Sequence, residues 1–247
     1  MEVDFCVRHC RSPLLELVLD YVYNPLSRVG FTACRSVASS LEKAMGHSRK
    51  EKAKTHLRIV ALASKRFREK GLTGIGIAEL MKQAGLTVGG FYKHFDSRDE
   101  LVIDAMRSAL GGWKRKLKAT AAGGPPVTYE SLVDDYLSEA HRDNPATGCP
   151  VGALAGEVAR GDKRTRALVT QEAQDNIELL ASLLRSGDGR HNREARSQAI
   201  LAYCGLVGAI TVARAVSDEQ LSREILKTVA QLLKNSARKV APRQDRR

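Results

Sequence analysis

Apolar residues recur at helical spacing along most of this chain, and no stretch of useful length alternates with a period of two. The pattern therefore excludes a sheet and predicts an all-α fold. Hydrophobic residues make up 43% of the 247 residues, which is enough to build a core. The strongest interruption is the Gly-Gly-Pro-Pro run at 123–126, a loop signal that divides the helices into two groups.

Two helices open the first group. The first begins near Lys52 and ends at Gly71, because a glycine suits the left-handed conformation of a helix end. Its predicted apolar stripe consists of Leu57, Val60, Ala61, Ser64 and Phe67. The second helix is short and ends at Gly85, and its predicted inner face consists of Ile77, Leu80, Met81 and Ala84.

Two more helices complete this group. A very short one is predicted over 87–94, with Thr87 as its N-cap. A capping box follows, in which Ser97 accepts from a backbone amide and Glu100 reaches back, and it opens a helix that runs to about Lys118. Beyond the loop, helices are predicted over 128–142, 150–160, 163–186, 192–215 and 218–239, the last one capped by Asp218.

Positive charge is concentrated in one part of the chain. The 40 lysines and arginines exceed the 28 aspartates and glutamates, which gives a net charge of +12. Residues 45–118 account for +10 of this excess, residues 119–247 for +2 and residues 1–44 for none. Such a block is typical of a protein that binds a polyanion, and the alternative is a solvated basic surface.

The sequence gives little support for other classes of protein. The five cysteines are odd in number and scattered, which argues against a disulfide framework and favours a reducing cytoplasm. Cys6, His9 and Cys10 have no matching second pair, so no metal site is predicted. The longest uncharged run, 197–213, is shorter than the ~20 residues that span a bilayer, so no membrane segment is expected. Phosphate-loop and dinucleotide glycine patterns are absent from the sequence, so we expect neither an enzyme nor a cofactor.

The second and third predicted helices meet in a tight turn at Gly85, inside the basic block. This arrangement predicts a helix-turn-helix, whose second helix enters the major groove of DNA. The segment 76–101, GIAELMKQAGLTVGGFYKHFDSRDEL, resembles the DNA-binding domain of the TetR family of transcriptional repressors. The resemblance extends over about 52–112 and rests on Ala84-Gly85-Leu86-Thr87, Gly89, Phe91-Tyr92, Phe95, Ser97 and Glu100-Leu101.

The resemblance implies a role in DNA binding for several residues. Tyr92 would donate its hydroxyl to a phosphate, and Thr87 would cap the third helix and contact phosphate or a base. Lys93 and His94 would lie along the DNA backbone, and packing is the alternative role for Tyr92 and His94. The residues expected to contact DNA are Arg49, Lys50, Lys52, Thr87, Val88, Gly89, Gly90, Tyr92, Lys93 and His94.

Two of these residues depart from the family's usual pattern. Val88 stands where a polar residue is common, and it could contact a thymine methyl group. Gly90 stands where Thr, Ser or Ala is common. Together with Gly89 it costs the short helix roughly 1 kcal/mol per glycine but would let the backbone approach the duplex closely. The resemblance therefore does not imply which bases are read.

The resemblance assigns the second half of the chain to dimerisation and sensing. The last two helices would form a four-helix bundle between two chains, through Gly205, Gly208, Ala209, Leu201, Leu206, Val207 and Ile210. The middle helices would enclose a ligand pocket, lined by Tyr129, Leu132, Tyr136, Cys149, Leu154, Val158, Ile177 and Leu180. The alternative for both sets is the plain core of one chain.

Cys149 stands at the predicted start of a helix, with Pro150 at the first helical position. A helix N-terminus favours the thiolate form of a cysteine. Because some members of the family detect electrophiles or oxidants, Cys149 is a candidate for that reaction, and a small packed residue is the alternative. Cys204 lies among apolar residues and is expected to be inert.

The sequence therefore predicts an N-terminal extension over 1–44, a helix-turn-helix domain over 45–118 and a helical regulatory and dimerisation domain over 119–247. The extension is either an upstream segment or an accessory helix. The expected protein is a cytoplasmic homodimer that represses transcription from a palindromic DNA operator until a small-molecule effector or an electrophile releases it. The alternatives are an activator of the same fold and a helical protein-interaction module without DNA binding.

Overall fold

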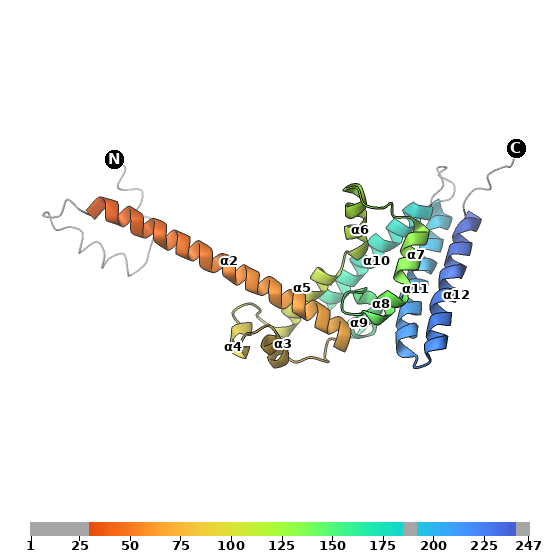
Figure 1. Cartoon of the computed structure of the whole chain (residues 1–247), viewed down its shortest axis with the longest axis horizontal. Helices are drawn as coiled ribbons and strands as arrows, with labels where there is room; N and C mark the ends of the chain where they lie inside the picture. The colour runs from red at the N-terminus through yellow and green to blue at the C-terminus, as the bar shows by residue number, and fades with distance from the viewer. Residues whose placement is uncertain (1–29, 185–191, 241–247) are drawn as a thin grey trace. The chain divides into compact units, whose positions relative to one another are not determined.

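The computed structural model describes the backbone of residues 30–184 and 192–240, and the side chains of residues 49–184 and 193–237. Every regular element within these ranges is a helix, which confirms the predicted all-α class (Figure 1). The chain divides into two compact units, Met1–Lys54 and Thr55–Arg247. Cys6, His9 and Cys10 lie outside the described residues.

Helix α2 runs from Gly30 to Lys70 and thus begins well before the predicted start near Lys52. Residues 41–54 are rich in Lys, Arg, Glu and Ala, which favour helix, so the segment that carries the expected DNA contacts Arg49, Lys50 and Lys52 is helical. The predicted apolar stripe of α2 was partly wrong, because Leu57 is 66% exposed and Ala61 is exposed as well. The buried face is formed by two adjacent i, i+4 rows and consists of Ile59, Val60, Ala63, Ser64 and Phe67.

Three helices pack against the end of α2: α3 (Ile77–Gln83), α4 (Val88–Phe91) and α5 (Arg98–Ala109). Their inner faces share one hydrophobic cluster with α2, which we call the N-terminal cluster. Ser97 caps α5 as predicted, because its hydroxyl accepts from the Glu100 amide at 3.2 Å. The Glu100 carboxylate pairs with Arg164 instead of reaching back, so only half of the capping box is formed.

The helix predicted over 98–118 is broken in the structure. Helix α6 (Gly112–Ala121) follows α5 after Gly111, whose φ of +77° lies in the left-handed region. The Gly111 amide donates to Glu172 at 2.9 Å, and Arg115 donates to the Leu110 carbonyl at 2.6 Å. These bonds satisfy backbone groups that the break would otherwise leave unpaired. The Gly-Gly pair at 111–112 was the signal for this break.

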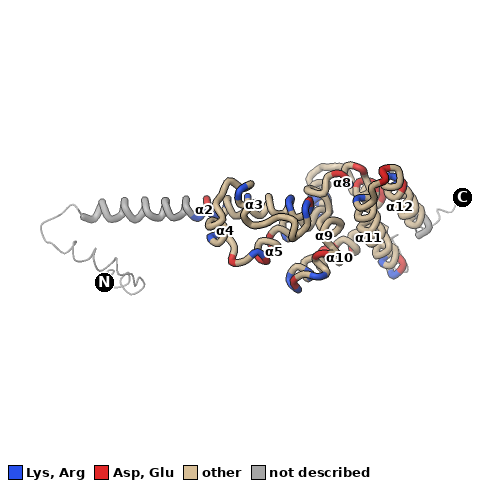
Figure 2. Tube along the Cα trace, turned by 90° about the horizontal axis from the view of Figure 1, so that it is seen from below, with Lys and Arg blue, Asp and Glu red and all other residues tan. Residues whose placement is uncertain are grey.

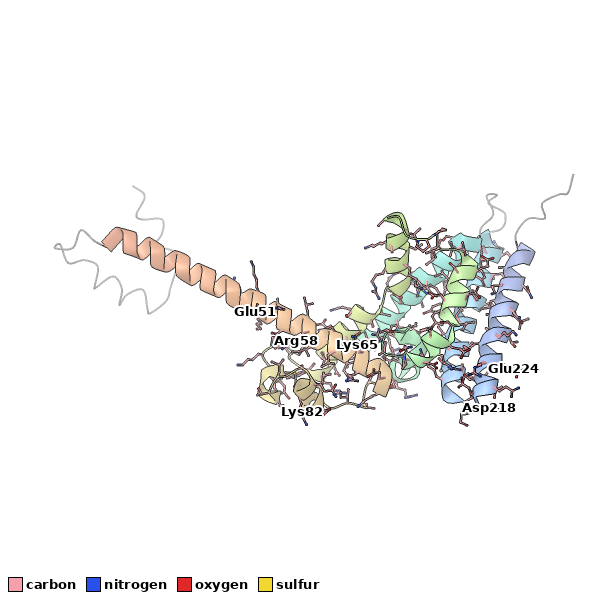
Figure 3. The ribbon with its side chains drawn as sticks, viewed as in Figure 1. Glu51, Arg58, Lys65, Lys82, Asp218 and Glu224 are labelled. Carbon is pink, nitrogen blue, oxygen red and sulfur yellow. The ribbon has the colours of Figure 1, made fainter. Side chains whose placement is uncertain are left out.

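The segment predicted as one helix over 128–142 also contains two, α7 (Tyr129–Tyr136) and α8 (Glu139–Asp143). Ser138 separates them, because its hydroxyl accepts from the His141 amide and caps α8. The later helices agree with the prediction and are α9 (Pro150–Ala159), α10 (Lys163–Leu184), α11 (Asn192–Ala215) and α12 (Glu219–Val240). Asp218 caps α12 in the turn after α11, where it accepts from two amides at 2.8 and 3.2 Å (Figure 3).

Helices α7, α10, α11 and α12 form a second hydrophobic cluster, which we call the C-terminal cluster. Helix α11 packs against both α10 and α12, and the three lie side by side (Figure 1). Helix α9 links the two clusters, because Leu154 and Val158 belong to the N-terminal cluster and Cys149 packs against the C-terminal one. Near the end of α9, the Glu157 carboxylate accepts from the Leu72 amide at 2.8 Å.

Among the described residues, one stretch (Arg193–Ala215, in α11) is long and apolar enough to cross a membrane by length and composition alone. Core helices of soluble proteins meet the same criterion. The charged residues of α11 lie near its ends, and its middle is uncharged (Figure 2). Because α11 packs between α10 and α12, burial within the C-terminal cluster accounts for part of this composition, and exposed apolar residues such as Leu201 account for the rest.

Candidate functional site

The turn between α3 and α4 fixes the geometry of the predicted helix-turn-helix. Gly85 has a φ of +69°, which a glycine adopts without strain. The Leu86 amide donates to the Met81 carbonyl at 2.9 Å and closes the turn. Leu80, Met81 and Phe91 are at most 1% exposed. The two helices therefore pack as one unit, which holds α4 in a defined orientation.

The outer side of α4 and the residues after it carry most of the predicted DNA contacts. The exposed members are Thr87, Val88, Gly89, Tyr92 and Lys93, and the half-buried ones are Gly90 and His94. Tyr92 is 66% exposed, although its ring contacts the edge of Phe91 at a centroid distance of 5.2 Å. Its ring is thus positioned by packing while its hydroxyl lies outside the core.

Thr87 does not make the capping bond that its position predicted. It stands at the N-cap of α4 with extended backbone angles, but its hydroxyl accepts no hydrogen bond from an amide of α4. The first bond of this four-residue helix runs instead between backbone groups, from the Gly90 amide to the Thr87 carbonyl at 3.0 Å.

The fold does not require the two glycines of α4. A Cβ atom at Gly89 would meet no atom within 4 Å, and one at Gly90 would meet Met81 and Thr87 at an ordinary 3.7 Å. Both positions have negative φ, so neither is a turn that demands glycine. Their presence therefore has no steric explanation within the described chain, which is consistent with a partner that approaches the backbone closely.

His94 is half-exposed, and its ring packs against neighbouring rings. Its ring lies 6.2 Å from that of His56 and 6.4 Å from that of Phe95. His56 in turn stacks on Phe95 at 4.6 Å and contacts Asp104 at 3.3 Å. A packing role thus accompanies any contact that His94 makes with DNA. The more distant basic residues, Arg49, Lys50 and Lys52, are exposed on α2 and belong to the unit that ends at Lys54.

A cavity of about 330 Å³ lies among α6 to α11. Two residues of the predicted pocket, Tyr136 and Cys149, line it. Leu154 and Val158 lie in the N-terminal cluster instead. The remaining four, Tyr129, Leu132, Ile177 and Leu180, belong to the C-terminal cluster or pack against it.

Sequence reasoning missed the other residues that give this cavity its chemistry. Besides Tyr136 and Cys149, the aromatic, basic and amide members of the lining are Trp113, Arg115, Lys116, His141, Asn176 and Tyr203. Trp113 meets both Tyr136 and Tyr203 edge to face, at centroid distances of 5.8 and 6.4 Å. These residues come from distant parts of the chain, so no local pattern indicates that they meet. The one local indication was Tyr203, an isolated phenol in the uncharged run of α11.

A hydrogen-bonded chain fixes the backbone at Cys149. The Cys149 amide donates to His141 Nε2 at 2.9 Å, and His141 Nδ1 donates to the Tyr136 carbonyl at 2.6 Å. The imidazole is therefore neutral and carries its proton on Nδ1. Burial lowers the pKa of His141, and the charges of Arg214 and Lys116 lower it further. Cys149 itself is half-buried at the N-cap of α9, whereas Cys204 is exposed on α11.

The outer side of α11 and α12 carries an uncharged surface, which we call the outer stripe. On α11 its exposed members are Ser197, Ile200, Leu201, Cys204, Gly208, Thr211 and Val212. On α12 they are Leu221, Thr228 and Leu232. Leu201 and Leu232 are 57% and 63% exposed. Five residues predicted for the dimer bundle lie elsewhere: Leu206, Ala209 and Ile210 are buried within the chain, Val207 packs against the C-terminal cluster, and a Cβ at Gly205 would contact Leu233.

The described side chains contain no group of three or more His, Cys, Asp or Glu residues that could hold a metal ion. Two places in the described part of the chain are candidate binding sites, the outer side of α4 and the cavity. The first is an exposed surface with a basic residue and an exposed phenol, and the second is a partly open cavity with mixed polarity. The two places suit a macromolecular polyanion and a small molecule, respectively.

Comparisons with known proteins agree with this geometry. Residues 59–105 match the family model of bacterial regulatory proteins, tetR family. The transcriptional repressor NemR of Escherichia coli K12 is 24% identical over 140 residues, a match that covers 56% of this chain and 66% of NemR. An HTH-type transcriptional regulator from the lacX 3′ region of Lactococcus lactis is 23% identical over 189 residues, which cover 75% of this chain and 94% of that protein.

Solved structures show the same fold. A TetR-family transcriptional regulator from Cytophaga hutchinsonii superposes with a TM-score of 0.62 at 21% identity, over 75% of this chain and 96% of that one. The reduced form of E. coli NemR superposes with a TM-score of 0.58 at 22% identity, over 74% and 96% of the two chains. The matched three quarters of the chain extend well beyond the residues 59–105 of the family model.

Proposed function

Because this chain belongs to the TetR family of bacterial regulatory proteins and is a DNA-binding transcriptional regulator, we propose that it acts as a homodimeric repressor in the cytoplasm. Its operator is a palindrome, and a small molecule bound in the cavity releases it. The observation that carries the proposal is the outer side of α4, where exposed polar and basic residues stand on a turn that the core holds rigidly.

Dimerisation supplies the second half of the operator contacts. One helix-turn-helix reads few base pairs, and two-fold dimers place their recognition helices about 34–36 Å apart on successive turns of DNA. The outer stripe supports this part of the proposal, because it is a long uncharged surface with several exposed leucines. Gly208, where a Cβ would meet nothing, would let the partner's helix approach closely.

Release of DNA requires the cavity to influence α4, and helix α9 offers a direct connection. Its first residues line the cavity, whereas Leu154 and Val158 pack in the N-terminal cluster. Glu157 holds the loop after α2 through the Leu72 amide. A ligand that shifts α9 would therefore also shift the packing of the helix-turn-helix, to the extent that it binds the two arrangements with different affinities.

The experiment that tests the proposal is selection of bound sequences from random double-stranded DNA with the purified protein. We expect a single enriched motif with two-fold symmetry and half-sites about one helical turn apart. Enrichment of no sequence, together with no salt-dependent DNA affinity, would leave a protein-interaction module as the function. A reporter gene behind the selected operator separates repression from activation.

Substitutions at Tyr92 and Lys93 test the phosphate contacts. We expect Tyr92→Phe and Lys93→Ala each to weaken specific and non-specific DNA binding alike, by about tenfold, because each removes a hydrogen bond to a charged group. Lys93→Ala should also reduce the slope of log affinity against log salt by about one unit. Lys163→Ala, which removes an exposed lysine from α10, is the matched control. An unchanged slope with altered base preference would show that Lys93 reads bases instead.

An electrophile is the second mode of release, and Cys149 favours it because it lines the cavity at the start of α9. But-3-en-2-one adds to a thiol by forming a bond from sulfur to its terminal carbon, and the thiol proton moves to the adjacent carbon. We expect Cys149→Ser to bind DNA normally and to stay bound after this treatment, whereas Cys204→Ser is still released. Release of the Cys149→Ser protein at the same dose would leave only reversible effectors.

A further inference from the structure

Three guanidinium groups are gathered around the Cys149 end of the cavity without a carboxylate partner. Arg115 lines the cavity and donates to the carbonyls of α5, at Leu110 and Ala109. Arg68 and Arg214 do not line the cavity themselves, and they also donate to carbonyl oxygens, those of Ala146, His141 and Arg142. In the described part of the chain, none of the three forms an ion pair with an acid.

The carboxylates that line the cavity are already engaged. Asp135 pairs with Lys116, so this cation and this anion compensate each other. Glu172 accepts from the Gly111 amide at 2.9 Å and from Asn176 at 3.1 Å. Glu172 keeps its negative charge, because both of these donors are neutral, so the arginines and the lining residues together leave an excess of two positive charges. Arg68 and Arg214 are half-buried and Arg115 is exposed, so this excess lies in a partly desolvated region where an anion would be stabilised.

The electrostatics of the arginines agree with this description. Burial lowers the pKa of Arg68, and the charge of Arg115 lowers it further, while Cys149 and the Glu69 carboxylate act in the opposite direction. Burial likewise lowers the pKa of Arg214, against the raising effects of Tyr136, Cys149 and Asp143. Arg68 and Arg115 are thus like charges near each other, and Arg68 and Arg214 are both partly desolvated. An anion between them would relieve both the desolvation and the mutual repulsion.

Four buried donors in the same region form no hydrogen bond of normal geometry, although Cys149 lies beside the Tyr136 hydroxyl and Asn176 beside that of Tyr203. They are the hydroxyls of Tyr136 and Tyr203, Nε of Arg68 and Nη1 of Arg214. Tyr136 and Tyr203 line the cavity and are only 6% and 7% exposed. Burial raises the pKa of both phenols, so at neutral pH each keeps the proton that it can donate. A buried donor without a partner costs about 1–3 kcal/mol, which an acceptor in the cavity would recover.

We propose that the cavity binds a small organic acid, with its carboxylate toward Arg115 and the phenols of Tyr136 and Tyr203 and its apolar body against Trp113. Arg115 uses two of its five N–H groups on carbonyls, which leaves three for the carboxylate. The rings of Trp113, Tyr136 and Tyr203 supply the apolar wall. A volume of 330 Å³ is near the lower end of the ~300–1,000 Å³ of ligand pockets, which suits one aromatic ring with a short acidic chain.

The binding test uses three acids, benzoate, phenylacetate and cinnamate, and their uncharged amides. Trp113 is the single tryptophan of the chain and lines the cavity, so its fluorescence reports occupancy directly. We expect saturable binding of at least one acid, and binding of its amide weaker by about tenfold or more, because the amide lacks the charge. Equal binding of acid and amide, or no saturable binding of any acid, would overturn the proposal.

Two variants locate the carboxylate. Arg115→Gln and Tyr203→Phe should each weaken binding of the acid by about tenfold and leave binding of the amide within about threefold. Arg166→Gln, an exposed arginine on α10, is the control and should change neither. Tyr203→Phe keeps the ring, so its result stands even if Arg115→Gln disturbs the end of α5. Unchanged acid binding in both variants contradicts the proposed orientation.

This inference rests on the proposed function only in treating the cavity as the effector site. Binding is measured on the free protein, so failure of the acids to bind leaves DNA recognition by α4 untouched. Failure to find an operator would equally leave acid binding untouched. If the acid is the effector, the same compound lowers operator affinity, and the Tyr203→Phe protein requires about tenfold more of it.

Discussion

Glutamate in place of Leu201 is expected to convert the dimer into a monomer and to weaken binding to a palindromic operator by at least about a hundredfold. Leu201 is 57% exposed in the single chain, so the substitution removes little from the chain's own core. In a two-fold dimer both chains carry the substitution, so two glutamates of like charge lose their water at the interface. Such a burial costs several kcal/mol, which exceeds the ~2.7 kcal/mol of a hundredfold change.

The measurement compares sedimentation of the purified protein with its affinity for a full operator and for an isolated half-site. Half-site affinity should be unchanged, because α4 is far in sequence from the substitution and its packing is not altered. Thr170→Glu, which adds the same charge at an exposed position of α10, should remain dimeric. A Leu201→Glu protein that is still dimeric would show that the outer stripe is not the interface.

The residues around Leu201 show how far sequence reasoning reaches. The helix predicted over 192–215 is confirmed by α11. The apolar run of this helix did not reveal which of its apolar residues face inward, because Leu206 and Ile210 share their chemistry with Leu201. Their burial depends on the position of α10 and α12, and this long-range information is absent from the local pattern.

The two candidate sites also differ in how far the sequence alone could locate them. The surface of α4 that we propose to bind DNA could be located from the sequence, because residues 87–94 form one short segment, where the Gly85 turn and the buried Phe91 orient the neighbours. The cavity could not, because Trp113, Cys149 and Tyr203 meet only after several helices have packed. Composition favoured apolar lining residues such as Leu180, but those form the core, and the cavity is lined by polar-tipped side chains.

Replacing Phe91 by alanine should have the largest effect on the DNA-binding half of the molecule. Phe91 is fully buried and stacks on Phe95 at a centroid distance of 5.3 Å. Truncation of a buried phenylalanine lowers the free energy of unfolding by about 3–5 kcal/mol. Helix α4 has only four residues and no side-chain capping bond, so little else holds it in place. We expect operator binding to fall by more than about a hundredfold even while the protein stays folded.

Hydrogen exchange read by mass spectrometry shows where the Phe91→Ala protein loses structure. Amides of α3 and α4 should lose protection, whereas those of α11 and α12 keep it, because the latter belong to the C-terminal cluster. Tyr92→Ala, at the exposed neighbouring position, should lower DNA affinity without this loss of protection. Equal loss of protection in both clusters would contradict the expected independence of the two. It would show instead that α9, which packs Leu154 and Val158 into the N-terminal cluster, makes the helices of residues 55–247 unfold as one cooperative unit.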